Sequence, residues 1–164
     1  MRALRVFLCV AGLSVTQGAQ ARELVGVSGF QSGQIIIKSS ERRLYLVLNE
    51  REAIAYPVAV GKPGKQWFGV KQIDGKYVQP AWSPPQEVKR DNPNLPDVIA
   101  GGSPHNPMGE RALTLTGGDY AIHGTNRPES IGKFASYGCI RMLNADIKDL
   151  FERVSVGTSV VVVR

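Results

Sequence analysis

The sequence predicts a mainly β domain, either a β-sandwich or a partly closed barrel of mixed sheets, with one α-helix packed against it near the C-terminus. Two observations support this fold class. Short runs of β-branched and aliphatic residues, separated by polar or glycine-containing segments, recur along the chain and are typical of strands. One late segment instead carries apolar residues at helical spacing.

Residues 1–21 have the pattern of an export signal. Arg2 and Arg5 precede an uncharged apolar stretch from Val6 to Val15, and Ala19-Gln20-Ala21 is a small-x-small cleavage sequence. The apolar stretch is too short to span a bilayer. We therefore expect an exported mature domain, residues 22–164, without a membrane span and with the periplasm as its location.

The length and charge of the mature segment suit one globular domain. Without Arg2 and Arg5, the 20 basic residues become 18 against 14 acidic ones, a net charge of +4. This weak bias comes without the basic clusters that track phosphates, so nucleic acid is not an expected partner. The histidines and the remaining thiol show no ligand spacing, so no metal is expected.

Three strands are expected first, at residues 35–38, 44–48 and 53–60. Proline cannot donate to a strand ladder, so Pro57 predicts that the third strand lies at a sheet edge or carries a bulge. Asp74-Gly75 is a two-residue turn sequence that matches strand twist. The flanking segments, 67–73 and 76–82, are therefore expected to form a hairpin.

Residues 83–107 differ in composition, with six prolines and Gly101-Gly102. They predict a long irregular loop with one helical turn near residues 86–90. Loops of this length in compact domains usually serve function.

The C-terminal part predicts two strands, 112–116 and 120–123, then a helix and a last strand, 160–163, buried on both faces. Asn144 is expected to cap the helix and Gly157 to end it. The helix carries apolar residues at helical spacing: Ile147, Leu150, Phe151 and Val154.

Cys139 is the only cysteine after residue 21. Exported proteins usually pair their structural cysteines, so a lone thiol suggests chemistry, although a buried inert cysteine is an alternative. A thiol with a pKa of about 8.5 needs a neighbouring imidazole to take its proton. The sequence therefore predicts a cysteine nucleophile and calls for a histidine.

His123 is the better of the two candidate bases. It falls at the end of an expected strand, which is a rigid support, and Gly124 lets a substrate approach closely. His105 lies in the proline-rich loop, where loop packing or a rim contact is the expected use. The alternative for His123 is a structural role, as a core histidine whose hydrogen bonds are satisfied.

Gly138 can adopt a backbone conformation that is sterically unavailable to other residues. It would leave the amides around Tyr137, Gly138 and Cys139 free to point at a developing oxyanion. A plain tight turn is the alternative interpretation.

These residues resemble the L,D-transpeptidase catalytic domain of the YkuD type, and the likeness runs from about residue 34 to 164. It rests on six blocks: Tyr56-Pro57-Val58-Ala59-Val60-Gly61-Lys62-Pro63-Gly64, Asn106-Pro107-Met108-Gly109, Ile122-His123-Gly124-Thr125, Glu129-Ser130-Ile131-Gly132, Ser136-x-Gly138-Cys139-Ile140-Arg141-Met142 and Asn144-x-Asp146-Ile147.

The resemblance implies that Cys139 is the nucleophile, His123 the general base and the amides around Gly138 the oxyanion donors, with no cofactor. In that family the thiolate attacks the carbonyl of the third residue of a peptidoglycan tetrapeptide stem and expels D-alanine. The acyl group then passes to an amine of a second stem, giving a 3→3 cross-link, to a free D-amino acid, or to an envelope protein. Water as acceptor would make the enzyme a carboxypeptidase, and carbapenems are expected to acylate the thiol.

Two departures from the family pattern concern the substrate groove. Tyr137 replaces the commoner histidine, and Gln66-Trp67-Phe68-Gly69 replaces a Thr-Pro-x-Gly block. Trp67 and Trp82 could line the donor groove or pack in the core.

Three polar side chains near the thiol also need interpretation. Arg141 could hold a substrate carboxylate through its planar fork or form an ion pair with a neighbour such as Asp146. Ser130 and Ser136 are expected to brace the loop rather than react.

Two other classes of function stay open. One is another extracytoplasmic cysteine hydrolase or a sortase-like enzyme, although a membrane anchor and the usual sortase arginine context are not apparent. The other is a non-catalytic module that binds the cell wall.

Overall fold

The computed structural model describes residues 22–118 and 120–164, so the predicted signal segment lies outside the described residues. The first half contains β1 (Glu23–Gly26), β2 (Ile35–Lys38), β3 (Arg43–Val47), β4 (Glu52–Gly61), β5 (Gly69–Val78) and α1 (Gln86–Asp91). The second half contains β6 (Arg111–Leu115), β7 (Ala121–His123), a 3-10 turn (Pro128–Ser130), β8 (Phe134–Ser136), β9 (Ile140–Met142), α2 (Asn144–Arg153) and β10 (Ser159–Val163). None of the described helices is long and apolar enough to cross a bilayer.

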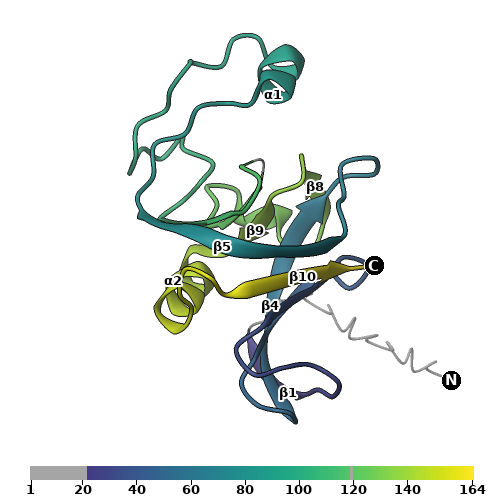
Figure 1. Cartoon of the computed structure of the whole chain (residues 1–164). Coiled ribbons are helices and arrows are strands. Elements are labelled where there is room, and N and C mark those ends of the chain that lie inside the picture. Colours follow the sequence, from purple (N-terminus) through teal and green to yellow (C-terminus); the bar gives the residue numbers. More distant parts are fainter. Residues whose placement is uncertain (1–21, 119) are drawn as a thin grey trace, which may run out of the picture.

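Eight strands form a closed ring. Their order is β4-β3-β2-β10-β5-β6-β7-β9, and β9 pairs back onto β4. The pairs β2–β10 and β7–β9 are parallel, whereas their neighbours in the ring are antiparallel. β1 and β8 lie outside the ring, each paired with β4 (Figure 1). The predicted mainly β fold of mixed sheets is confirmed, and of the two alternatives the barrel describes it.

β4 is the strand on which the ring closes. Its first half pairs with β1 and β3, and its second half with β9 and β8. Of the two alternatives predicted from Pro57, the edge strand is therefore wrong, whereas a bulge or irregularity does occur in β4, between Val60 and Gly61 where it pairs with β8. The Val58 amide bonds to Arg42 on the β3 side, so the missing N–H of Pro57 faces the other side. There the pairing with β1 has ended at Ala55 and that with β9 starts at Val58.

The hairpin predicted at Asp74-Gly75 is also wrong, because both residues lie within one ten-residue strand, β5. They form a bulge where β5 faces β6, and the Thr114 hydroxyl donates to the Asp74 carboxylate. Long-range pairing with β10 and β6 on its two sides overrides the local turn preference. Beyond Val78 the chain leaves the sheet, and Trp82 makes an isolated bridge with Ile99.

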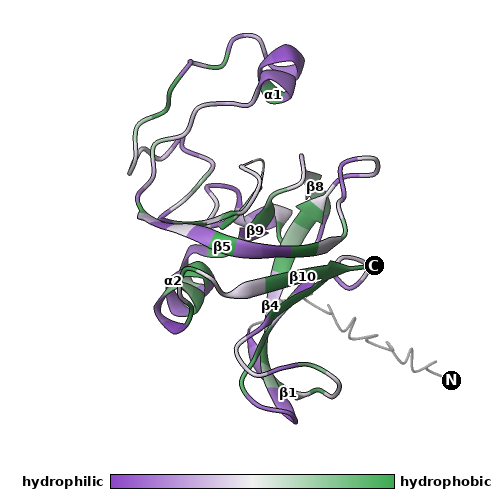
Figure 2. Ribbon diagram, viewed as in Figure 1, coloured by the Kyte–Doolittle hydropathy of each residue, from purple (hydrophilic) through white to green (hydrophobic). Residues whose placement is uncertain are grey.

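The long loop at residues 83–107 is present and contains α1, as predicted. α1 has no buried residue. In Figure 1 this loop and α1 rise above one end of the barrel, far from β1, and in Figure 2 α1 is mostly hydrophilic while β4 and β10 are strongly hydrophobic. The loop is therefore an appendage to the core rather than part of it.

α2 packs Ile147 and Leu150 into the barrel core, and Val154, just after the helix, joins them; each is at most 4% exposed. Three local predictions about this region need correction. Leu143 rather than Asn144 occupies the N-cap position, and no side chain caps the helix. It ends at Arg153, so Gly157 belongs to the following turn. In β10 the valines alternate between buried and partly exposed positions, so the strand is not buried on both faces.

Candidate active site

One wall of the candidate site is formed by two adjacent parallel strands. β7 and β9 pair with Ile122 opposite Ile140 and His123 opposite Arg141. Alternate side chains project to opposite faces, so Ile122 and Ile140 enter the core, where they are buried. His123, Cys139 and Arg141 project to the other face, and all three line one pocket of about 460 Å³. Cys139 and His123 are thus diagonal neighbours across the sheet.

The opposite wall of this pocket comes from the proline-rich loop. Pro85, Val88, Leu95 and Ile99 supply apolar surface, and Trp82 lies beside them. His105 also lines the pocket and is exposed, in agreement with a rim position. A pocket of this size with a few convergent polar groups suits a small molecule or a short peptide.

His123 is held in the tautomer that a base needs. Its Nδ1 lies 2.6 Å from the Gly124 carbonyl oxygen. A carbonyl only accepts hydrogen bonds, so Nδ1 carries the proton and Nε2 of the neutral ring has a free lone pair. The pKa of His123 is lowered to about 4, mainly by burial and also by the Arg141 charge, while bonds to the Gly124 and Pro107 carbonyls oppose the shift. The imidazole is therefore neutral at neutral pH.

Cys139 is partly accessible. Burial raises the pKa of its thiol, whereas a backbone contact with Ala121 and the Arg141 charge lower it. The resting pair is consequently a neutral thiol and a neutral imidazole. Proton transfer to His123 then has to accompany the attack on a substrate.

The turn before Cys139 requires glycine. Gly138 has φ 121°, and a Cβ there would lie 2.4 Å from Cε1 of Tyr120. The Gly138 carbonyl accepts a bond of 3.0 Å from Nε1 of Trp67, and the Trp67 ring stacks on Tyr120 with centroids 5.1 Å apart. Trp67 thus braces the turn from behind and is not one of the pocket residues, whereas Trp82 is.

Ser136 braces the same turn, as expected from the sequence. Its hydroxyl donates to the Cys139 carbonyl at 2.5 Å and accepts from the Gly138 amide at 3.1 Å. The Gly138 amide is therefore occupied. The amides of Tyr137 and Cys139 donate to no group in the described part of the chain, which makes these two the candidate oxyanion donors.

Asn144 fixes the segment that follows His123, a role that sequence reasoning missed. Its Oδ1 accepts from the amides of Glu110 and Thr125, both at 3.2 Å, and its Nδ2 donates to the Thr125 carbonyl at 3.1 Å. A Cβ on Gly124 would lie 2.2 Å from Oδ1. Gly124 thus admits the Asn144 side chain, and it does not line the pocket.

Tyr137 connects the catalytic turn to the loop. Its hydroxyl donates to the Asp91 carboxylate in α1 at 2.5 Å, and this bond is the main reason that the pKa of Asp91 is lowered. Lys62 lies over the Tyr137 ring at 3.7 Å and 3.8 Å from Asp91. A second ion pair joins Lys65 to Glu87. The tyrosine that replaces the commoner histidine therefore contacts the loop.

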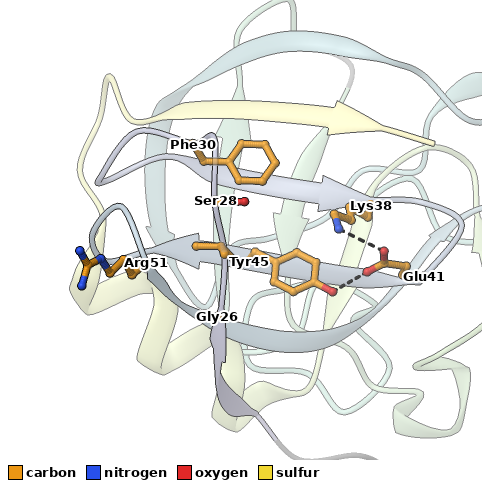
Figure 3. A pocket seen from close by; sticks show the side chains of 8 residues that line it. Gly26, Ser28, Phe30, Lys38, Glu41, Tyr45 and Arg51 are labelled. Carbon is orange, nitrogen blue, oxygen red and sulfur yellow. Dashed lines mark hydrogen bonds and ion pairs between the residues drawn. The ribbon is translucent and has the colours of Figure 1, made fainter.

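A second pocket, of about 540 Å³, is lined by residues of β1, β2 and β3 and of the turns that follow them (Figure 3). Its polar groups already satisfy one another, because Lys38 and Tyr45 both bind the Glu41 carboxylate while Arg51 points away from them. Burial and the bond to Glu41 raise the pKa of Tyr45 to about 12. This pocket offers neither a thiol nor an imidazole, so the chemistry is better placed beside Cys139. Residues 22–118 and 120–164 contain no cluster of three side chains that could hold a metal.

Comparisons with known proteins identify the family of the domain. Residues 32–162 match the model of the YkuD family, the L,D-transpeptidase catalytic domain. A probable L,D-transpeptidase of Escherichia coli K12, YbiS, is 41% identical over 135 residues, which cover 77% of this chain and 43% of that protein. The chain thus spans less than half the length of this curated relative.

Two solved structures share the fold. The L,D-transpeptidase LdtMt1 in complex with imipenem is 18% identical with a TM-score of 0.60, over 79% of this chain and 57% of that one. A Brucella melitensis protein titled probable carnitine operon oxidoreductase is 38% identical with a TM-score of 0.59, over 90% of this chain and 96% of that one. Its name gives a different activity, whereas the family model and the curated relative are both L,D-transpeptidases. The chain belongs to the YkuD family of L,D-transpeptidase catalytic domains.

Proposed function

We propose that this chain is the catalytic domain of an exported L,D-transpeptidase that acts on peptidoglycan stem peptides. The observation that carries the proposal is the placement of His123 and Cys139 as diagonal neighbours on one face of the β7–β9 pair, at the wall of a pocket. Membership of the family supplies the substrate class, and the signal pattern at residues 1–21 supports export to the periplasm.

In the acylation step, Nε2 of His123 takes the proton of Cys139 as the sulfur attacks the carbonyl carbon of the third stem residue. The negative charge that develops on the carbonyl oxygen is stabilised by the amides of Tyr137 and Cys139, which have no acceptor among the described residues. When the C–N bond breaks, the imidazolium returns the proton to the leaving amine of D-alanine. A thioester on Cys139 remains.

In the second step an amine attacks the thioester. His123 takes a proton from the attacking nitrogen, the C–S bond breaks, and the proton passes to the sulfur of Cys139. The acceptor amine belongs to a second stem, a free D-amino acid or an envelope protein. With water as acceptor the same site would act as an L,D-carboxypeptidase, which is the alternative function.

Acylation by carbapenems is expected for the same reason. A strained lactam carbonyl can take the place of the stem carbonyl above Cys139, and a protein of the same fold has been crystallised with imipenem. A stable adduct of the thiol would be visible as a mass increase.

The two histidines that line the pocket allow a matched test. Residues 22–164 and the variants C139A, H123Q and H105Q are incubated with purified muropeptide tetramers, with and without D-methionine, and the products are read by mass spectrometry. C139A and H123Q should lose dimer formation, D-methionine exchange and the carbapenem adduct, whereas H105Q should retain them. Full activity of C139A or H123Q would overturn the proposal, and release of D-alanine without any amine product would favour the carboxypeptidase.

A further inference from the structure

Two arginines line the pocket beside the nucleophile. Arg141 follows Cys139 by two residues on β9, on the same face of the sheet. Arg127 comes from the turn between β7 and the 3-10 helix and faces the same space. The pocket therefore presents two guanidinium groups near the thiol.

Neither guanidinium has a protein partner in the described part of the chain. Among the described residues, no ion pair or hydrogen bond involves the guanidinium of Arg141 or Arg127, and Arg127 is hydrogen-bonded only through its backbone, for example to the hydroxyls of Thr125 and Ser130. Arg153, by contrast, makes two bonds to Asp149 at 2.9 and 3.0 Å. The Asp146 pair considered from the sequence does not form, since the charges that act on Asp146 are those of Arg22 and Asp149. Arg141 is thus left facing the pocket.

This arrangement is electrostatically unfavourable until an anion arrives. Arg141 is half-buried, and its pKa is lowered mainly by burial and also by the Arg127 charge, while Cys139 and, more weakly, the exposed Glu129 oppose the shift. A half-buried arginine still keeps its proton. A carboxylate bound between the two groups would replace the lost hydration with charge-assisted hydrogen bonds.

We propose that Arg141, assisted by Arg127, binds a carboxylate of the donor stem next to the scissile bond. This inference rests on the proposed function and assigns a role within the same site. A tetrapeptide stem offers two carboxylates near that bond, the terminal one of the D-residue that is expelled and the one on the side chain of the third, diamino acid residue.

The spacing of the wall favours the terminal carboxylate. Residues two apart on a strand are roughly 7 Å apart along it, so Arg141 lies close to a carbonyl that is held over Cys139. The terminal carboxylate is separated from the scissile carbon by only one nitrogen and one α-carbon. The side-chain carboxylate is several bonds further away. Arg141 would then both select stems that end at the fourth residue and hold their carbonyl over the sulfur.

The test compares three synthetic donors: the tetrapeptide stem, its C-terminal amide, and the stem amidated only on the diamino acid side chain. Each is reacted with the wild-type domain, R141Q, R127Q and R51Q, in which the exposed Arg51 lies outside this pocket and serves as the matched control. The rate of acyl-enzyme formation is followed by intact mass and by release of the fourth residue.

Wild type and R51Q should acylate the free acid about 30-fold faster than the C-terminal amide, as expected for loss of a charge-assisted bond. R141Q should bring the two donors to within about 3-fold, and R127Q should reduce the preference to an intermediate value. Equal use of acid and amide by the wild type would overturn the assignment, as would an unchanged preference in R141Q. A loss of rate confined to the side-chain amide would also overturn it.

A separate measurement removes the effect of Arg141 on the thiol itself. Arg141 lowers the pKa of Cys139, so R141Q should shift the pH profile of alkylation by neutral iodoacetamide to higher pH. That shift affects both donors equally and leaves their ratio as the readout. If iodoacetamide alkylates the wild-type thiol but neither peptide acylates it, the proposed function fails together with the inference. If both peptides acylate it equally, only the carboxylate assignment fails.

Discussion

The two walls of the catalytic pocket are built in different ways. The strand wall, formed by β7, β9 and the turn before Cys139, is continuous with the barrel, and its His123 side chain is only 4% exposed. The loop wall, residues 83–107, carries α1, which buries none of its residues. The loop is anchored at its base by the buried Asn106, whose amide group donates to the carbonyls of Pro80 and Ala100.

The difference lies in what holds each wall in place. The strand wall is held by the backbone pairing of its strands, by the hydrogen bonds of Asn144 and by the contact of Tyr120 with Gly138. The α1 end of the loop wall depends on Tyr137, Lys62 and Lys65 and their carboxylate partners, which are solvent-accessible and contribute little each. We infer that the reacting groups lie on the rigid strand wall, whereas the loop wall, which shapes the substrate pocket, can open at a low cost in free energy.

The largest effect should follow from a change in the strand wall. G138A puts a Cβ 2.4 Å from the Tyr120 ring at φ 121°, which must displace the turn that carries Cys139. We expect acylation to slow by about 100-fold, because displacements near 1 Å have such effects. The matched control is G64A, since Gly64 also has a positive φ, 78°, but has open space around it.

Stopped-flow acylation by a carbapenem measures both variants. G64A should keep a rate close to that of the wild type, which separates backbone strain from displacement of the thiol. If G138A reacts as fast as G64A, the turn before Cys139 is not rigid and the contrast between the walls fails.

Burial of His123 should make the strand wall sensitive to acid. Its folded pKa of about 4 is below the unfolded value of 6.5, so the unfolded chain binds more protons between these two pH values. The stability contributed by the neutral ring is complete above about pH 6.5 and is lost as the pH falls towards 4. The full contribution is on the order of 3 kcal/mol.

Urea unfolding of the wild type, H123Q and H105Q at pH 4.5, 5.5 and 7 checks this prediction. H123Q should show a weaker dependence of the unfolding free energy on pH than the wild type, whereas H105Q should follow the wild type. Parallel profiles for all three proteins would mean that His123 titrates normally.

The sequence predicts the strand wall better than its surroundings. His123 and Cys139 were found because they belong to short, characteristic patterns, and the position of His123 at a strand end follows from the apolar run before it. Closure of the barrel was not predicted, since β9, the strand that pairs back onto β4, has only three residues, and so few residues show no clear alternation. Asp74-Gly75 was misread because a local turn preference says nothing about the two strands that pair with β5.

The role of Asn144 and the contacts that hold the loop could not be predicted from the sequence either. An asparagine before an apolar helix usually acts as a cap, and only the fold reveals that its amide reaches Glu110 and Thr125. The bond from Tyr137 to Asp91 joins residues 46 positions apart. The folded path of the chain brings such partners together, and no periodic pattern in the sequence identifies them.

Removal of the Asn144 amide should loosen the strand wall without touching a reacting group. N144A leaves the amides of Glu110 and Thr125 without their acceptor, which should cost about 2 kcal/mol of unfolding free energy. Acylation should slow by about 10-fold because the segment around His123 loses its brace. N144D, which keeps the acceptor oxygen, should lose less on both measures. An N144A protein with normal acylation would show that β7 alone positions the imidazole.

The smallest effect is expected at the junction of the two walls. Y137F removes the bond to Asp91 but keeps the ring under Lys62, and D91N keeps the shape but removes the charge. Each change should raise KM for a stem peptide by about 3-fold and leave kcat near the wild-type value, because the loop shapes the pocket without taking part in the proton transfers. The double variant should add little to either single one, since Y137F removes and D91N weakens the same contact. If Y137F instead lowers kcat as far as G138A does, the phenol takes part in the chemistry and does more than hold the loop wall.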